Sequence, residues 1–201
     1  MTRSQVEPTP TASPTSLANR FARVIWGCVQ ATLFRLSPRP CHRWRALLLR
    51  LFGAKLDTGA RVYPKAKIWA PWNLRMGERA TIADDVDCYC YDTITIGPGA
   101  IISQYTYLCG ATHEFELVKR PLIPMPITIG RGVWVAADVF VGPGVTIGEY
   151  SVVGARSSVF TDLPAWKVCV GSPARPVRDR VFTDGPEETR RQPAAEARGE
   201  P

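Results

Sequence analysis

Aliphatic side chains recur every six residues along the second half of this chain. The series contains Ile129, Val135, Val141, Ile147, Val153 and Val159. A β-strand repeats its inward side chains every two residues and an α-helix about every 3.6, so neither explains a sustained period of six. A short strand followed by a tight turn does explain it, because each unit then returns one side chain to the interior. The spacing predicts a mainly β fold, a parallel β-helix of hexapeptide repeats.

The same spacing fills most of the preceding chain. Its members are Leu56, Val62, Ile68 and Leu74; Met76, Ile82, Cys88 and Ile94; and Ile96, Ile102 and Leu108. Between series the register advances by two residues, which keeps the same strand face inward. Three hexapeptides plus that step therefore form one coil. A β-sandwich of short strands would not hold one period over two long stretches, and Gly-Pro-Gly at 97–99 and 142–144 suits the corners of a coil.

Composition divides the 201 residues into one folded unit with two polar ends. Residues 1–16 are rich in Thr, Ser and Pro, and residues 179–201 in Glu, Arg, Pro and Ala, so we expect both ends to be disordered. Residues 17–55 fit two amphipathic helices separated at Pro38 and Pro40 and stopped at Gly53. The β-helix is predicted for residues 56–178, with a loop at 109–126.

Positive charge is concentrated in the predicted helices. Between Arg20 and Lys55 there are eight Arg and Lys residues and no Asp or Glu, in a chain of formal net charge +7. Two interpretations stay open. The apolar stripe caps the open end of the β-helix, lies on an anionic membrane surface, or does both. The apolar run is interrupted by Arg23, Gln30 and Arg35, so we expect neither a membrane span nor a secretory signal. The candidates for membrane contact are Trp26, Phe34, Trp44, Leu48 and Phe52.

The six cysteines indicate a reducing compartment. They form neither a Cys-x-x-Cys zinc pair nor the framework of a small disulfide-rich domain, so we interpret them as reduced thiols of a cytoplasmic protein. Cys88 occupies an inward position of the repeat and is expected to pack as a small hydrophobe. We expect no bound metal and no nucleic-acid partner.

The repeat fails once, between Leu108 and Ile127, where the chain reads CGATHEFELVKRPLIPMP. These residues must leave the wall of the β-helix, and loops on rigid scaffolds commonly carry chemistry. His113 lies in this segment and is one of two histidines in the chain. A neutral imidazole near pH 7 accepts a proton from a hydroxyl, so His113 is a candidate general base.

Several motifs together point to a known family. They are the hexapeptide blocks, the extruded Thr112-His113, the stretch ITIGRGVWVAADVFVGPGVTIGEYSVVGARS and the ending VGSPARPVR. The chain resembles the left-handed β-helix acyltransferases, among them the galactoside, maltose and serine acetyltransferases. With residues 17–55 included, it most resembles the colanic acid biosynthesis acetyltransferases of the WcaF type. The resemblance implies a left-handed coil and a homotrimer with active sites between neighbouring β-helices.

The resemblance also implies roles for individual residues. His113 matches the family's general base, which activates an acceptor hydroxyl for direct attack on the thioester of acetyl-CoA. Trp134 matches a tryptophan beside the thioester end of that co-substrate. Small residues leave room for the pantetheine arm, and arginines suit phosphates. The other positions that match CoA contacts are Ala137, Ala155, Arg175 and Arg178.

Two positions depart from the family's pattern. Sugar acetyltransferases carry an Asn before the catalytic loop, where this chain has Cys90, so Cys90 and the nearby Asp92 are our candidates for binding the acceptor. Asp92 is also a candidate for orienting His113, with Asp87 and Glu114 as alternatives. The second departure is Phe160-Thr161, where relatives often present Thr-Lys to CoA, so nucleotide contacts are expected to differ.

The chain has three alternatives to direct acyl transfer. Zinc carbonic anhydrases share the implied fold but need three histidines per metal, and the repeat region offers only His113. A covalent route through Cys109, with His113 as its base, is chemically reasonable. A non-catalytic scaffold held at a membrane by its basic helices is the alternative from another functional class. The sequence favours an acetyl-CoA-dependent O-acetyltransferase acting on a sugar hydroxyl in exopolysaccharide or capsule synthesis, in the cytoplasm and possibly at the inner face of the membrane.

Overall fold

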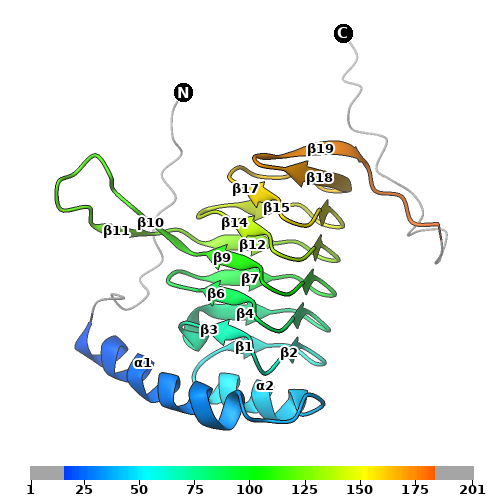
Figure 1. The fold of residues 1–201 in the computed structure, drawn as a ribbon. Coiled ribbons are helices and arrows are strands. Elements are labelled where there is room, and N and C mark those ends of the chain that lie inside the picture. The colour runs from blue at the N-terminus through cyan, green and yellow to red at the C-terminus, as the bar shows by residue number, and fades with distance from the viewer. Residues whose placement is uncertain (1–15, 184–201) are drawn as a thin grey trace.

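Three parallel sheets wrap around one core in the computed structural model, which describes residues 16–183 (Figure 1). Sheet A contains β1 (Lys55–Leu56), β4 (Leu74–Met76), β7 (Ile94–Ile96), β12 (Ile127–Ile129) and β15 (Thr146–Ile147). Sheet B contains β2 (Arg61–Val62), β5 (Thr81–Ile82), β8 (Ile101–Ile102), β13 (Trp134–Val135), β16 (Val152–Val153), β18 (Lys167–Gly171) and β19 (Ala174–Asp179). Sheet C contains β3 (Lys67–Ile68), β6 (Asp87–Tyr89), β9 (Tyr107–Cys109), β14 (Phe140–Val141) and β17 (Ser158–Val159).

The chain visits sheets A, B and C in turn, so each circuit is one coil of a three-sided parallel β-helix, as the spacing predicts. Equivalent positions stack without slippage, for example Ile96, Ile129 and Ile147 in sheet A. Every member of the series from Ile129 to Val159 is at most 1% exposed. Burying an aliphatic side chain of this size stabilises the fold by about 1.5–3 kcal/mol, so the stacked series supplies the core.

The outer surfaces of the three sheets differ. Sheet A presents Arg75, Thr95, Thr128 and Thr146 in register. Sheet C instead carries a group of aromatic rings, here called the aromatic face. Its rings follow one another along the column, with centroid separations of 6.5 Å from Tyr89 to Tyr107 and 5.8 Å from Tyr107 to Phe140. The aromatic face consists of Trp69, Tyr89, Tyr91, Tyr107, Phe140 and Phe160.

Helices close the first coil, which confirms the capping interpretation. α1 (Leu17–Val29) runs into a π-helical turn (Gln30–Phe34), and α2 (His42–Leu51) follows the predicted break (Figure 1). The side-chain oxygen of Ser16 caps α1 by accepting a hydrogen bond from Asn19 N. Trp26, Phe34 and Leu49 join the same core cluster as the inward residues of the strands. A 3₁₀ turn (Pro71–Asn73) connects the first coil to the second.

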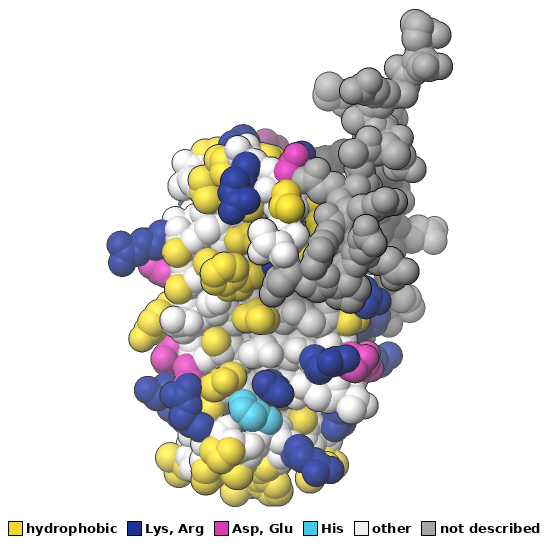
Figure 2. Space-filling model, turned by 90° about the vertical axis from the view of Figure 1, so that its right-hand side faces the viewer, with side chains coloured by type: hydrophobic (Ala, Val, Ile, Leu, Met, Phe, Trp, Pro, Cys, Tyr) yellow, Lys and Arg dark blue, Asp and Glu magenta, His cyan; other side chains and the backbone are white. Residues whose placement is uncertain are grey.

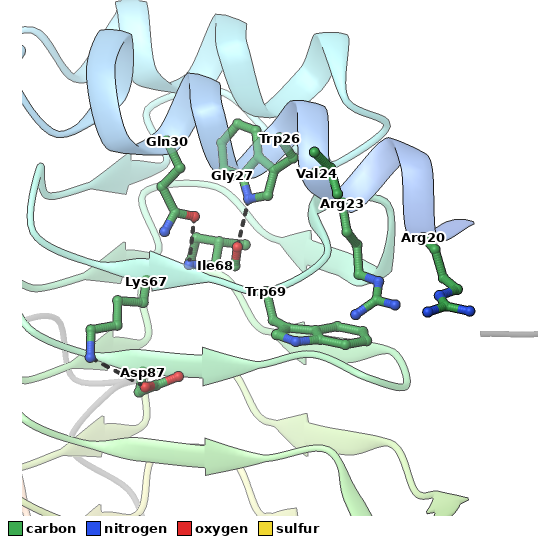
Figure 3. Close-up of a pocket in the computed structure, with 10 residues that line it drawn as sticks. All are labelled: Arg20, Arg23, Val24, Trp26, Gly27, Gln30, Lys67, Ile68, Trp69 and Asp87. Carbon is green, nitrogen blue, oxygen red and sulfur yellow. Dashed lines mark hydrogen bonds and ion pairs between the residues drawn. The ribbon is translucent and has the colours of Figure 1, made fainter. Parts of the chain in front are cut away.

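Polar contacts fix α1 on the edge of sheet C (Figure 3). The Trp26 indole N–H donates to Ile68 O at 2.6 Å, and Ile68 N donates to Gln30 Oε1 at 3.1 Å. The Arg23 guanidinium lies 4.4 Å from the ring centroid of Trp69. Within residues 16–183 no helix combines the length and the apolar character needed to cross a bilayer.

The prediction of a disordered end from residue 179 is wrong for its first residues. Arg180 donates hydrogen bonds to Gly132 O and Tyr150 O, and the ring of Phe182 packs on those of Tyr150 and Trp166. Contacts that a basic and an aromatic side chain make with the last coils therefore extend the folded unit. The predictions of disorder for residues 1–15 and 184–201 lie outside the described residues.

Candidate functional site

The segment that breaks the repeat, predicted as a loop at 109–126, is a β-hairpin. β10 (Ala111–His113) pairs antiparallel with β11 (Leu122–Pro124), and His113 lies opposite Leu122. We call residues 110–126 the arm. It projects from the side of the β-helix, at the corner where sheet C passes to sheet A (Figure 1). The arm places His113 on an exposed strand beyond the wall of the β-helix.

Gly110 allows the chain to leave the wall. A Cβ atom at this position would lie 2.6 Å from Tyr89 O, which is closer than carbon and oxygen can approach. Gly110 N also donates to Tyr89 O, and Gly110 O accepts hydrogen bonds from Asp92 N and Met125 N. These bonds tie Gly110 to the coil below and join the two ends of the arm to each other. The sequence carries this signal as a glycine next to the break in the period.

One hydrogen bond sets the tautomer of His113. Its Nδ1 lies 2.7 Å from Arg120 O. A carbonyl oxygen only accepts hydrogen bonds, so Nδ1 must carry a hydrogen, and in the neutral ring Nε2 then keeps its lone pair. The imidazole is thus held as a base with Nε2 available. Sequence reasoning missed Arg120 in this role because the contact is made by its backbone.

The two candidates for acceptor binding have different surroundings. Asp92 lies beside the base of the arm, half-buried, and its Oδ1 accepts a hydrogen bond from Thr93 N at 2.6 Å. It is not the group at Nδ1 of His113. Cys90 is fully buried, and its Sγ lies 3.2 Å from both Ala70 N and Ala70 O. The prediction that Cys90 contacts an acceptor is therefore wrong, since its side chain points into the core.

Most of the predicted CoA contacts gather at another corner, where sheet B passes to sheet C. Ala137 and Ala155 follow β13 and β16 there, and Arg156 N donates to Ala137 O from the next coil. Trp134 is 46% exposed on sheet B, and its indole N–H donates to Ser103 Oγ at 3.1 Å. Arg175 pairs with Val170 at the same end of sheet B. These residues lie one above another at this corner in successive coils, and we call them the CoA column.

The one remaining predicted contact lies apart from that column. Arg178 pairs with Val168, toward the opposite end of β18 from Arg175. Arg175 also approaches Thr161, whose Oγ1 lies 3.4 Å from its Nη1. The position that departs from the family's pattern, Thr161, therefore lies beside Arg175, one of the predicted cationic contacts.

A single chain does not bring His113 and this column together. The arm leaves at the corner after sheet C, and the column lies at the corner before it, so the whole width of sheet C separates them. A pocket of about 520 Å³ does lie on sheet C, between α1 and β3 (Figure 3), but its lining includes Arg23, Lys67 and Trp69 and not His113.

The thiol of Cys109 does not face the imidazole. Its Sγ donates to Ala111 O at 3.2 Å, and the side chain is half-buried. A nucleophilic cysteine needs its base within hydrogen-bond reach. The geometry of the isolated chain therefore gives no support to the covalent route.

Comparison with known proteins connects this architecture to enzymes. A model of the bacterial transferase hexapeptide family, built of six repeats, matches residues 126–161. The chain is 50% identical over 160 residues to WcaF of Escherichia coli K12, which is named, provisionally, as a colanic acid biosynthesis acetyltransferase. The match covers 80% of this chain and 88% of that one.

Two further relatives are informative. The galactoside O-acetyltransferase of Escherichia coli K12 is 36% identical over 124 residues, which cover 60% of this chain and 55% of that one. A hexapeptide-repeat acetyltransferase of Vibrio cholerae, solved in complex with acetyl-CoA, superposes with a TM-score of 0.71 at 27% identity. That superposition covers 83% of this chain and 91% of the Vibrio chain.

Proposed function

Since the chain belongs to the hexapeptide-repeat acetyltransferases, as half of its aligned residues are identical to those of WcaF, we propose that it transfers acetyl from acetyl-CoA to a saccharide hydroxyl. In this proposal the enzyme works in the cytoplasm, in the biosynthesis of an extracellular or capsular polysaccharide. The observation that carries the proposal is the hydrogen bond from His113 Nδ1 to Arg120 O, which leaves Nε2 free on an exposed strand.

The proposed reaction is a direct transfer. Nε2 of His113 takes the proton of the acceptor hydroxyl as its oxygen attacks the thioester carbon. The tetrahedral intermediate places negative charge on the former carbonyl oxygen, which a backbone N–H of the neighbouring subunit stabilises. The C–S bond then breaks, the ester remains on the saccharide, and the thiolate of CoA takes the proton from the imidazolium. Holding both substrates together supplies much of the rate.

The column at the corner between sheets B and C suits a long, anionic co-substrate. The small side chains of Ala137 and Ala155 let the pantetheine arm approach the backbone, and the exposed ring of Trp134 covers the thioester end. Arg175 supplies a cation for the phosphates, with Arg178 as a second. Support comes from the acetyl-CoA in the Vibrio cholerae structure. Asp92 at the base of the arm is the proposed hydrogen-bond partner of the acceptor, and the galactoside enzyme supports a sugar.

The proposed enzyme is a homotrimer whose sites lie between chains. The arm and the CoA column lie at opposite edges of sheet C, so a threefold arrangement with the aromatic faces toward the axis brings the arm of one copy to the column of the next. The aromatic face is suited to burial in such a contact. Burial and the nearby Cys109 raise the pKa of Tyr107 to about 12.

Replacing the base tests the function directly. The His113→Ala protein should lose acetyl transfer by about 10²–10⁴-fold, because general base catalysis contributes that much. Its affinity for acetyl-CoA should stay unchanged. The assay follows thiol release from acetyl-CoA with a panel of saccharide acceptors, and isothermal titration measures binding. Val118→Ala, a change at the 99% exposed tip of the arm, is the matched control.

The alternatives give different results in the same assays. Normal turnover of the His113→Ala protein would show that another group is the base. A non-catalytic scaffold would bind no acetyl-CoA at all. A covalent route through Cys109 would exchange label between CoA and acetyl-CoA without an acceptor, and direct transfer would not.

A further inference from the structure

The helices that cap the β-helix carry a second apolar surface on the side that faces away from it. The most exposed members are Leu17 at 80%, Leu36 at 78% and Leu51 at 71%. Apolar side chains at this exposure contribute nothing to the core, which already buries Trp26, Phe34 and Leu49 from the same helices. We call the surface the outer apolar stripe, and its main residues are Leu17, Phe21, Val24, Leu36, Leu47 and Leu51, of which Val24 also lines the pocket between α1 and β3.

Helical geometry makes the stripe continuous on each helix. Leu17, Phe21 and Val24 follow the spacing of one helix face, and Trp26 lies about half a turn away from them. On α2, Leu47 and Leu51 share a face opposite the fully buried Leu49. Hydrogen bonds from Trp26 and to Gln30 fix the inner face on Ile68 (Figure 3). The outer face is therefore presented in a fixed orientation.

Arginines surround the stripe without acidic neighbours on the same elements. Arg20, Arg35 and Arg43 are exposed, and none of them forms an ion pair with another described residue. The sequence from 17 to 55 contains no Asp or Glu. Figure 2 shows hydrophobic side chains gathered at the lower end of the molecule with Lys and Arg around them. The surface is therefore both apolar and cationic.

We propose that this end of the molecule docks on an anionic phospholipid bilayer, with α1 and α2 lying in the headgroup layer. Acyl chains would receive the outer apolar stripe, and the guanidinium groups would pair with lipid phosphates. A second copy of the chain fits less well, because it would bring two uncompensated cationic surfaces together. The proposal does not depend on acetyl transfer. In the proposed homotrimer, the three stripes would face the same way and bind with avidity.

Vesicle binding tests the proposal with the full chain. The protein should co-sediment with vesicles of phosphatidylcholine and phosphatidylglycerol, and far less with phosphatidylcholine alone. A protein carrying Phe21→Gln, Val24→Gln and Leu47→Gln should bind the anionic vesicles about tenfold more weakly or worse, since apolar burial is lost. Val181→Gln changes a 59% exposed valine at the other end of the β-helix, and this protein should bind like the unmodified chain. Thermal unfolding checks that each variant is folded.

A second variant tests whether the arginines pair with lipid phosphates. Arg20→Gln, Arg35→Gln and Arg43→Gln together should also weaken binding to anionic vesicles by about tenfold or more, and added salt should weaken binding of the unmodified chain. Equal binding to neutral and anionic vesicles would overturn the proposal, as would no vesicle binding at all. Self-association that disappears in the Phe21→Gln, Val24→Gln, Leu47→Gln protein, without vesicle binding, would identify the stripe as a contact between copies instead.

Discussion

At His113, the position of one hydrogen decides whether the ring can work as a base. The carbonyl of Arg120, on the returning strand of the arm, holds the hydrogen on Nδ1. The tautomer that the proposed base requires is thus a product of the hairpin, since the chain must turn within the six intervening residues to bring the two groups together. No carboxylate is required for this, although a carboxylate was the orienting group expected from the sequence.

Trp134 carries the prediction for co-substrate binding at the residue scale. Trp134→Ala should raise the KM for acetyl-CoA about tenfold with a smaller change in kcat, because the ring's contact with the thioester end is lost. Trp134→Phe keeps a ring and removes only the hydrogen bond to Ser103, so it should have a KM within about threefold of the unmodified chain. Steady-state kinetics measures both. An unchanged KM in the alanine protein would remove Trp134 from the proposed site.

The turn between the capping helices depends on one buried arginine. Arg45 is 0% exposed and donates hydrogen bonds to Val62 O, Pro38 O, Arg39 O and Ser37 Oγ, at 2.6–2.8 Å. Its Nη2 also lies 3.1 Å from Nδ1 of His42, whose pKa is lowered chiefly by burial. Arg45 therefore joins the prolines of the helix break to the first coil of the β-helix.

Removing this arginine should loosen the cap. Arg45→Met removes the donor to the buried carbonyl of Val62 and the hydrogen bonds to Pro38 O and Arg39 O, so the free energy of unfolding should fall by about 3 kcal/mol. Arg43→Met, an exposed change in the same helix, should cost less than about 0.5 kcal/mol. Chemical denaturation monitored by circular dichroism compares the two. Equal stability of both proteins would contradict the structural role of Arg45.

On the scale of the whole molecule, the choice of interface rests on the contrast between sheets. Phe140 lies in the middle of the aromatic face, and Thr128 occupies the outer surface of sheet A. Phe140→Glu should dissociate the proposed trimer and abolish activity, because a carboxylate would be buried in the contact without a partner. Thr128→Glu should leave the assembly intact. Light scattering after size-exclusion chromatography measures both masses, and a monomeric unmodified chain would rule out the trimer.

The β-helix could be predicted because inward positions repeat, and a period is visible in a single sequence. The backbone conformations at the corners were harder to predict. Glycines at 99 and 144 have positive φ as expected. Arg79, Asp85 and Tyr105 also have positive φ, and their residue types do not predict it. The left-handed winding stays a prediction from the family resemblance.

The candidate site could be predicted in part, for similar reasons. The role of His113 as the base stays a prediction, and the sequence points to this residue because a histidine coincides with the break in the period. Cys90 was misassigned although alternation already pairs it with the inward Cys88, two residues earlier. Arg120 O could not be found, since a backbone carbonyl at a hairpin turn has no sequence signature.

The central claim is that the base of one chain acts on acetyl-CoA held by another, and mixed assemblies test it most directly. One inactive protein carries His113→Ala, and a second carries Trp134→Ala with Ala155→Tyr. Unfolded and refolded together in equal amounts, they should regain about a quarter of normal activity, because chance then pairs an intact arm with an intact column at that share of the sites. Each protein refolded alone should stay inactive. Failure of the mixture to regain activity, with trimers formed, would mean that each site is built from a single chain.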